Sequence, residues 1–192
     1  NAVAIVTGHH QDDQAETLLM NLLRGAGTRG LRGMQARNGL VVRPFLDAAR
    51  QDMEDYCRQQ GIVWCTDSSN ECTDYRRNSI RKELLPMLEK YNPQIRRALA
   101  NTAYLAAQDQ ELLEELANNY LRKNSLVKNG AFTLCVKDFS EIALALSTRV
   151  LILAFQNYAK ENDGQLERKH IEALLQLIKK GQSGRTLNLP GV

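Results

Sequence analysis

The sequence predicts an α/β protein in which a partial parallel sheet is followed by a mainly helical second domain. Two short apolar runs, "AVAIVTG" and "GLVVRPF", are typical of strands in a parallel sheet, which has both faces covered. Each run is followed by a segment with helical spacing, which is the alternation expected of an α/β fold. From Arg81 onward apolar residues recur at helical spacing over long stretches, which indicates a different second part.

The first part begins with a strand over residues 2–7 that is expected to be buried on both faces and to end at Gly8. A helix should follow, starting at a capping box formed by Asp13 and Glu16. Open α/β sheets bind ligands beyond the carboxyl ends of their strands, so a site is expected at this junction. The helix is indicated by apolar residues at helical spacing, namely Ala15, Leu18, Leu19, Leu22 and Leu23.

Glycines then punctuate a loop over residues 25–33, and "GLVVRPF" is predicted to be a second strand that Pro44 closes. Residues 47–60 should form an amphipathic helix that ends at Gly61. The run "IVWC" is a candidate third strand. The polar stretch "TDSSNECTDYRRNSIR" is expected to be a loop that leads into a new helix.

The second part is predicted to contain four helices and one isolated strand, "AFTLCV", at residues 131–136. Pro93 is expected to open the longest helix in its first turn. We place the domain boundary near residue 80, which gives domains of 1–80 and 81–192. The helices are expected near residues 81–91, 93–123, 141–161 and 167–179.

Composition excludes some classes of protein. The chain has 192 residues, of which 43% are hydrophobic and 24% charged, and no apolar run reaches the roughly 18 residues of a membrane span. We therefore expect a cytoplasmic protein without a membrane partner. The net charge of +3 permits nucleic acid binding but does not require it. The four cysteines form no C-x-x-C pair and are expected to be reduced thiols.

Three acids, Asp12, Asp13 and Glu16, crowd the start of the first helix. The helix dipole and the free backbone amides favour negative charge there, and capping alone would explain one acid. Three acids within five residues exceed that need, and Asp12 and Glu16 lie one turn apart on one face. Such a cluster can hold Mg²⁺ or bind a cationic group of a substrate, and the sequence does not decide between them.

His9 and His10 precede these acids at the end of the predicted strand. Zinc is disfavoured because the segment lacks the i, i+4 histidine pair of a zincin helix. The histidines are better candidates for positioning a phosphate or a base, although ordinary loop histidines would look the same. The identity of any bound metal stays unknown at this stage.

An arginine-rich loop follows, with six arginines and one acid between Arg24 and Arg50. The interleaved glycines allow close approach of the backbone to a ligand, and guanidinium groups bind phosphate bidentately. This composition favours an anion site over a solvated basic loop. The segment is not a Walker A loop, because the G-K-[ST] ending is missing.

Four blocks of the sequence resemble the bacterial tRNA(Ile)-lysidine synthetases, which belong to the N-type ATP pyrophosphatase (PP-loop) family. The blocks occur in the family's order and at similar distances, over residues 3–90. The helical remainder is similar to the family's middle, tRNA-binding domain. The blocks are "GHHQDDQAETLLMNLLRGAGTRGLRGM", "VVRPFL", "DSSN" and "YRRNSIRKELLPML".

The resemblance implies a Rossmann-like fold of the adenine nucleotide α-hydrolase type, and an enzyme that uses ATP and Mg²⁺. ATP would adenylate the C2 oxygen of the wobble cytidine in the CAU anticodon of tRNA(Ile), and free lysine would then displace AMP to give lysidine. Asp13 and Glu16 match the positions at which the family recognises lysine, with Asp12 as a further acid. Arg24 is assigned to catalysis with these three acids. The implied nucleotide- or tRNA-binding residues are His9, His10, Arg43, Arg77 and Asn78.

One departure from the family is large. The family's nucleotide loop, S-G-G-x-D-S, occurs nowhere in this sequence. The polypeptide as given is therefore expected to be a fragment of the synthetase that is inactive alone. Two other hypotheses stay open, a related ATP pyrophosphatase that thiolates tRNA and a non-catalytic RNA-binding module built on residues 81–192. The sequence does not decide whether the chain forms a homodimer.

Overall fold

A computed structural model describes residues 3–65, 76–128, 131–158, 166–181 and 184–190. These residues divide into two compact units, Asn1–Gln110 and Glu111–Val192. The boundary predicted at residue 80 does not coincide with this division. The reason is that Ile80 and Leu85 pack against Leu19 of the first helix, which ties the segment after residue 80 to the first unit.

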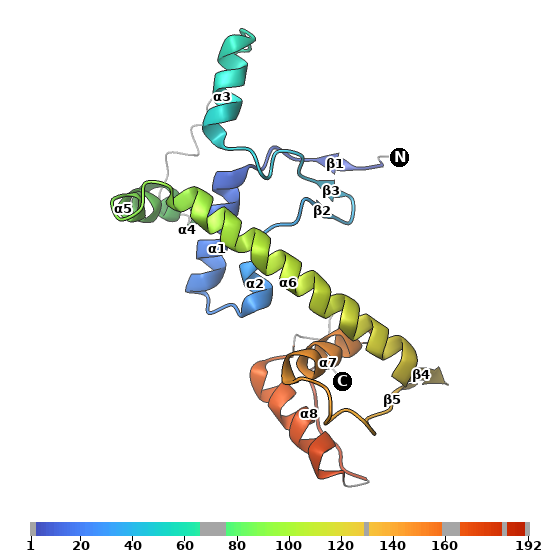
Figure 1. Ribbon diagram of the computed structural model, residues 1–192. Coiled ribbons are helices and arrows are strands. Elements are labelled where there is room, and N and C mark those ends of the chain that lie inside the picture. Colours follow the sequence, from blue (N-terminus) through green and yellow to red (C-terminus); the bar gives the residue numbers. More distant parts are fainter. Residues whose placement is uncertain (1–2, 66–75, 129–130, 159–165, 182–183, 191–192) are drawn as a thin grey trace. The chain divides into compact units, whose positions relative to one another are not determined.

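The sheet of the first unit has three short strands in the order β1-β3-β2 (Figure 1). β1 (Ile5–Val6) is parallel to β3 (Val41–Val42), whereas β2 (Arg37–Asn38) is antiparallel to β3. The parallel pair agrees with an α/β fold, but the sheet is mixed, so a Rossmann-like parallel sheet is not confirmed.

Three details of the predicted sheet are wrong. The side chains of Ile5 and Val6 are 53% and 67% exposed, so β1 is not buried on both faces. A parallel strand is buried only where other elements cover both sides of the sheet. The run "IVWC" at residues 62–65 forms no strand. β2 was not predicted, although the sequence Asn38-Gly39 is a strong hairpin signal and Gly39 has the positive φ of +57° that such a turn requires.

The first unit contains five α-helices within its described residues and shares a sixth with the second unit. α1 (Gln11–Leu23) follows β1, and the short α2 (Thr28–Leu31) lies in the glycine-rich loop. α3 (Arg50–Gln59) begins three residues later than the predicted helix and ends before Gly61, whose φ is +66°. The shared helix is α6, described below.

A helical stretch runs from Arg76 to Glu89 and begins earlier than predicted. It consists of α4 (Arg76–Ser79), a π-helical turn η2 (Ile80–Leu84) and α5 (Leu85–Glu89). Pro86 lies in the first turn of α5 and donates no hydrogen bond, and its ring would clash with the carbonyl four residues earlier in a regular α-helix. The wider π turn, in which Leu85 N donates to Ile80 O, avoids that clash.

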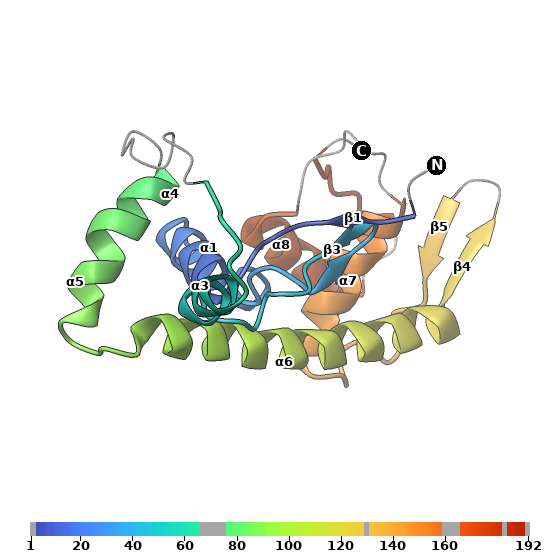
Figure 2. The same cartoon turned by 90° about the horizontal axis from the view of Figure 1, so that it is seen from above.

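α6 (Ile95–Asn124) is the long helix that the sequence predicts. It begins two residues after Pro93, so Pro93 precedes its first turn rather than lying in it. Asn92 caps this start, because its carbonyl accepts a hydrogen bond from Ile95 N at 2.9 Å and its Oδ1 accepts one from Gln94 N at 3.0 Å. Figure 2 shows α6 as one continuous helix.

The second unit contains a hairpin and two helices after the end of α6. β4 (Ser125–Lys128) pairs antiparallel with β5 (Ala131–Leu134), so the strand predicted at 131–136 is not isolated. α7 (Leu144–Tyr158) and α8 (Arg168–Lys180) follow, close to their predicted positions.

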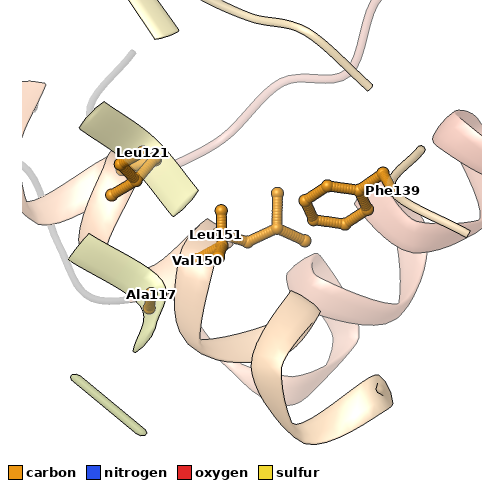
Figure 3. Packing of buried hydrophobic residues seen from close by; sticks show 6 residues of the cluster. Ala117, Leu121, Phe139, Val150 and Leu151 are labelled. Atoms are coloured by element: carbon orange, nitrogen blue, oxygen red, sulfur yellow. The ribbon is translucent and has the colours of Figure 1, made fainter. Parts of the chain in front are cut away.

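An apolar core holds the second unit together. Phe139 packs with side chains of α6 and α7 (Figure 3). Its ring lies 5.9 Å from that of Tyr120 in an edge-to-face arrangement. α8 adds a partly buried face to this core. The buried members are Ala117, Leu121, Phe139, Val150, Leu151 and Ala154.

No helix among the described residues combines the length and the apolar character that a membrane span requires.

Candidate functional site at the start of the first helix

The candidate site lies where β1 runs into α1. His10 is the N-cap of α1, since its Nδ1 accepts a hydrogen bond from Asp12 N at 3.3 Å. Asp13 completes the capping box, because its Oδ2 accepts a hydrogen bond from His10 N at 3.0 Å. The predicted box of Asp13 and Glu16 is therefore wrong, and Glu16 is left for another role.

Glu16 is fully buried and binds two arginines that follow 61 and 65 residues later in the chain. Its Oε2 accepts a hydrogen bond from Arg77 Nε at 2.7 Å, and its Oε1 accepts one from Arg81 Nε at 2.6 Å. Arg81 also donates through Nη2 to Oε2 at 3.1 Å. Both oxygens of this carboxylate are thus occupied by guanidinium groups.

Asp13 joins the same network. Its Oδ1 accepts hydrogen bonds from Arg77 Nη2 at 2.8 Å and from Arg81 Nη2 at 3.3 Å. The pKa of Arg81 lies above its ordinary value, chiefly because of its hydrogen bonds to Glu16; burial opposes the shift, and the nearby charges of Glu16, Asp13 and Asp12 support it. Arg81 therefore stays a cation throughout the physiological pH range. We call Asp13, Glu16, Arg77 and Arg81 the carboxylate–guanidinium network.

Asp12 points to a different arginine. Its Oδ2 accepts a hydrogen bond from Arg96 Nη1 at 2.9 Å, and Arg96 Nε donates to Glu89 at 2.6 Å. The sequence pattern does not distinguish Arg81 or Arg96 from other arginines. The sequence signal lay in the acids that these arginines bind, because three acids at a helix start need nearby cations if they are buried.

The described acids do not fit a metal ion. No group of three His, Cys, Asp or Glu side chains within the described residues is arranged to hold one. Each of Asp12, Asp13 and Glu16 instead has at least one oxygen bound by a guanidinium group, and Asp13 Oδ2 accepts a hydrogen bond from His10 N. Of the two ligands that the sequence left open for this cluster, Mg²⁺ therefore has no support from these residues.

His9 and Arg43 lie at the same edge of the sheet, because each follows one strand of the parallel β1–β3 pair. His9 Nδ1 pairs with the Thr7 hydroxyl at 2.8 Å. Arg43 donates through Nη1 to Gln35 O at 2.9 Å, whereas its buried Nε has no hydrogen-bond partner among the described residues.

Arg24 lies at the opposite end of α1, where it is the C-cap. With a rise of 1.5 Å per residue, its backbone is about 18 Å from that of Asp12. It lines a separate cavity of about 380 Å³ together with Arg76, Ser79 and four apolar residues, Met20, Leu23, Ile80 and Leu84. The structure thus brings Asp12, Asp13, Glu16 and Arg77 together but not Arg24.

Gln14 fixes the glycine- and arginine-rich loop to α1. Its Oε1 accepts a hydrogen bond from Met34 N at 2.7 Å, and its Nε2 donates to Met34 O at 2.9 Å. Gly33 has a φ of +59°, and a Cβ there would lie 2.6 Å from Gln14 Oε1, so any other residue is strained at this position and would displace the Gln14 amide. The sequence pattern did not predict this role of Gln14, because its partner Met34 lies twenty residues away.

Of the last two sequence blocks, the structure describes only the part of the fourth that begins at Arg76. Asn78 lies half-buried in α4, next to Arg77. The "DSSN" block at residues 67–70 lies outside the described residues, as does Tyr75 at the start of the fourth block.

The chain is similar to known proteins over most of its length. Residues 1–88 match the model of the PP-loop domain family. A protein of Geobacillus kaustophilus named tRNA(Ile)-lysidine synthase is 34% identical over 190 residues, which are 97% of this chain and 41% of the relative. Proteins with the same name from Geobacter sulfurreducens and Synechocystis are 36% and 34% identical, over 98% and 100% of this chain.

The chain spans 41% of the length of the Geobacillus and Geobacter proteins and 60% of the Synechocystis protein. These relatives match almost all of the chain and residues 1–88 match a PP-loop domain, so the chain is similar to tRNA(Ile)-lysidine synthases over nearly its whole length.

Proposed function

We propose that this chain takes part in the ATP-dependent ligation of lysine to C2 of the wobble cytidine in tRNA(Ile) with a CAU anticodon. In the first step the C2 oxygen attacks the α-phosphorus of ATP, and pyrophosphate leaves. In the second step the lysine amine attacks C2, and AMP leaves with the oxygen. The names of the relatives and the PP-loop match support this reaction.

The observation that carries the proposal is the convergence of Asp13 and Glu16 with Arg77 and Arg81 just beyond the end of β1. This is the position at which open α/β sheets bind ligands. The reaction involves a cationic amine and anionic phosphates, and the network contains partners for both. The proposed lysine-binding residues are Asp13 and Glu16, and Arg77 is the proposed nucleotide-binding residue.

The charges of the network constrain how lysine binds. Two carboxylates face two guanidinium groups, so their formal charges cancel, and Glu16 has no exposed surface. An ammonium group gains little from these acids while both arginines stay in place. The phosphates of ATP or of the adenylated cytidine would attract a guanidinium, because charge-assisted bonds to phosphate are strong. We infer that nucleotide binding frees a carboxylate oxygen for lysine.

The remaining predicted residues have separate parts in this proposal. His9 and Arg43 are at the edge of the sheet where a nucleotide would lie, and His10 acts through the helix cap. Arg24, with Arg76, would contact a more distant phosphate of the RNA. A contribution of Mg²⁺, a homodimer and a cytoplasmic location stay predictions, and no step above uses a metal ion held by the described residues.

A chimera tests the proposal. The matching segment of the Geobacillus kaustophilus relative is replaced by this chain, and incorporation of labelled lysine into unmodified tRNA(Ile) is measured with and without ATP. We expect ATP-dependent incorporation that Asp13→Asn abolishes. Binding of labelled lysine should also require a non-hydrolysable ATP analogue. A folded chimera that binds tRNA but incorporates no lysine would favour the non-catalytic RNA-binding module.

A further inference from the structure

A groove in the first unit lies beside the candidate site and has no role in the proposal above. It consists of two adjoining cavities of about 470 and 630 Å³, which share Gln11, Ala49 and Arg97. The smaller cavity reaches Asp12 and Arg96 of the candidate site. The larger one extends along α6 to Tyr104. We call the two together the α3–α6 groove.

One wall of the groove is a single face of α6. Arg97, Asn101 and Tyr104 are four and three residues apart, which places their side chains on the same side of the helix. Arg97 forms no ion pair with any described residue, and Tyr104 is 58% exposed. A guanidinium, an amide and an aromatic ring therefore follow one another along this wall, with the small side chain of Ala100 between them.

The opposite wall is acidic. Asp47 precedes α3 and Asp52 lies in its first turn, and both line the larger cavity. Within the described residues neither carboxylate forms an ion pair. In contrast, Glu54 in the smaller cavity is already bound by Arg50 and Arg58. The groove thus offers carboxylate acceptors opposite an aromatic ring.

This combination fits one unpaired nucleotide better than a duplex. Duplex RNA is bound largely through phosphate and sugar contacts, and the two free acids would repel its backbone. In an unpaired nucleotide the base can stack on an aromatic side chain, and carboxylates can accept hydrogen bonds from its amino groups or from ribose hydroxyls. A single arginine is then sufficient for the one phosphate.

We propose that the α3–α6 groove binds one unpaired nucleotide of the RNA substrate next to the reacting one. The base stacks on Tyr104, the phosphate pairs with Arg97, and Asp47 and Asp52 accept hydrogen bonds from the base or ribose. The inference rests on the proposed function only for the choice of RNA as the partner. The contiguity of the groove with Asp12 and Arg96 supports that choice.

The test uses the chain itself and a fluorescein-labelled, single-stranded RNA heptamer that contains CAU, with fluorescence anisotropy as the readout. Tyr104→Ala should weaken binding about tenfold, the loss expected from one base stack, whereas Tyr104→Phe should stay within about twofold of the parent. Tyr91→Ala is the matched control, because Tyr91 is 84% exposed and does not line the groove. Thermal melts followed by circular dichroism confirm that each variant is folded.

Salt dependence tests the phosphate contact. Arg97→Gln should reduce the slope of log affinity against log salt by about 0.7, the value for one contact to a single strand. Arg122→Gln, an exposed arginine of α6 outside the groove, should leave the slope unchanged.

Failure of this inference differs from failure of the proposed function. Absence of heptamer binding, or equal binding by Tyr104→Ala and Tyr91→Ala, would overturn the groove proposal even if the chimera forms lysidine. Groove-dependent RNA binding by a chain whose chimera incorporates no lysine would retain the groove and overturn the ligation.

Discussion

Different interactions stabilise the interior of each of the two units. The second unit has an apolar core of six buried side chains, whereas α1 in the first unit buries Asp13, Gln14 and Glu16 beside Ala15, Leu18 and Leu19. Burial of apolar groups stabilises a fold without requiring a partner, but a buried charge must be paired to be tolerated. A buried ion pair is weak evidence for stability. The network therefore indicates that charges are needed at these positions for a reason other than stability.

Among changes to the apolar core of the second unit, Phe139→Ala should have the largest effect. Phe139 is 3% exposed, and removing its ring should cost about 4 kcal/mol in the free energy of unfolding. Hydrogen exchange resolved by segment measures the loss, which should appear in α7 and much less in α1. Equal acceleration of exchange in both helices would mean that the two units do not unfold separately.

Glu16→Gln should produce the largest effect on the charged side. The variant leaves Arg77 and Arg81 without their main counter-ion, which we expect to cost about 3 kcal/mol. Urea unfolding measures this change. Glu172→Gln is the control, because its partner Arg168 is exposed and the variant should unfold like the parent. If both variants unfold alike, the buried network contributes nothing to the first unit.

Gly33→Ala should have a smaller effect, about 2 kcal/mol, because it combines a left-handed backbone with a clash against Gln14. Gly39→Ala separates the two causes, since Gly39 has a similar φ of +57° and nothing within 4 Å of an added Cβ. Its cost should be about 1 kcal/mol. Thermal unfolding compares them, and equal losses would show that the contact with Gln14 is irrelevant.

The smallest effect concerns Tyr120 in the second unit. Burial raises the pKa of its hydroxyl above the ordinary value of 10.0, and the negative charges of Asp138 and Cys135 add to the shift. The unfolded chain loses this proton more easily than the folded chain. The contribution of Tyr120 to the free energy of unfolding is therefore complete below pH 10 and declines as the pH rises through the pKa of the folded state. Tyr120→Phe should remove that part of the pH dependence of unfolding. An unchanged profile would assign the effect to other groups.

The helices could be predicted because their apolar spacing is local. α3, α6, α7 and α8 lie close to the expected positions. The positions of β1, β3 and β5 were also predicted, but the two-residue length of β1 and β3 and their pairing were not, because pairing depends on distant segments. β4 and β5 carried a usable signal, since Asn129-Gly130 stands between two apolar runs and such pairs favour hairpins.

The candidate site was predictable in part. Crowding of Asp12, Asp13 and Glu16 predicted a charged cluster at this helix end, but the spacing could not show that Arg81 and Arg96 neutralise them. Those arginines lie more than sixty residues away in sequence, and only tertiary packing brings them close. Arg24 follows the acids closely in sequence but lies at the opposite end of α1, so its catalytic role with them stays a prediction.

The two hydrogen bonds between Gln14 and Met34 join the ends of residues 14–34, which we call the closed ring. The length of the chain within this ring is therefore fixed. Insertions and deletions are therefore poorly tolerated within this ring, since one added residue would displace either Met34 or the end of α1. Exposed side chains on the ring remain free to vary. Divergent homologues should accordingly differ there by substitution and keep its length.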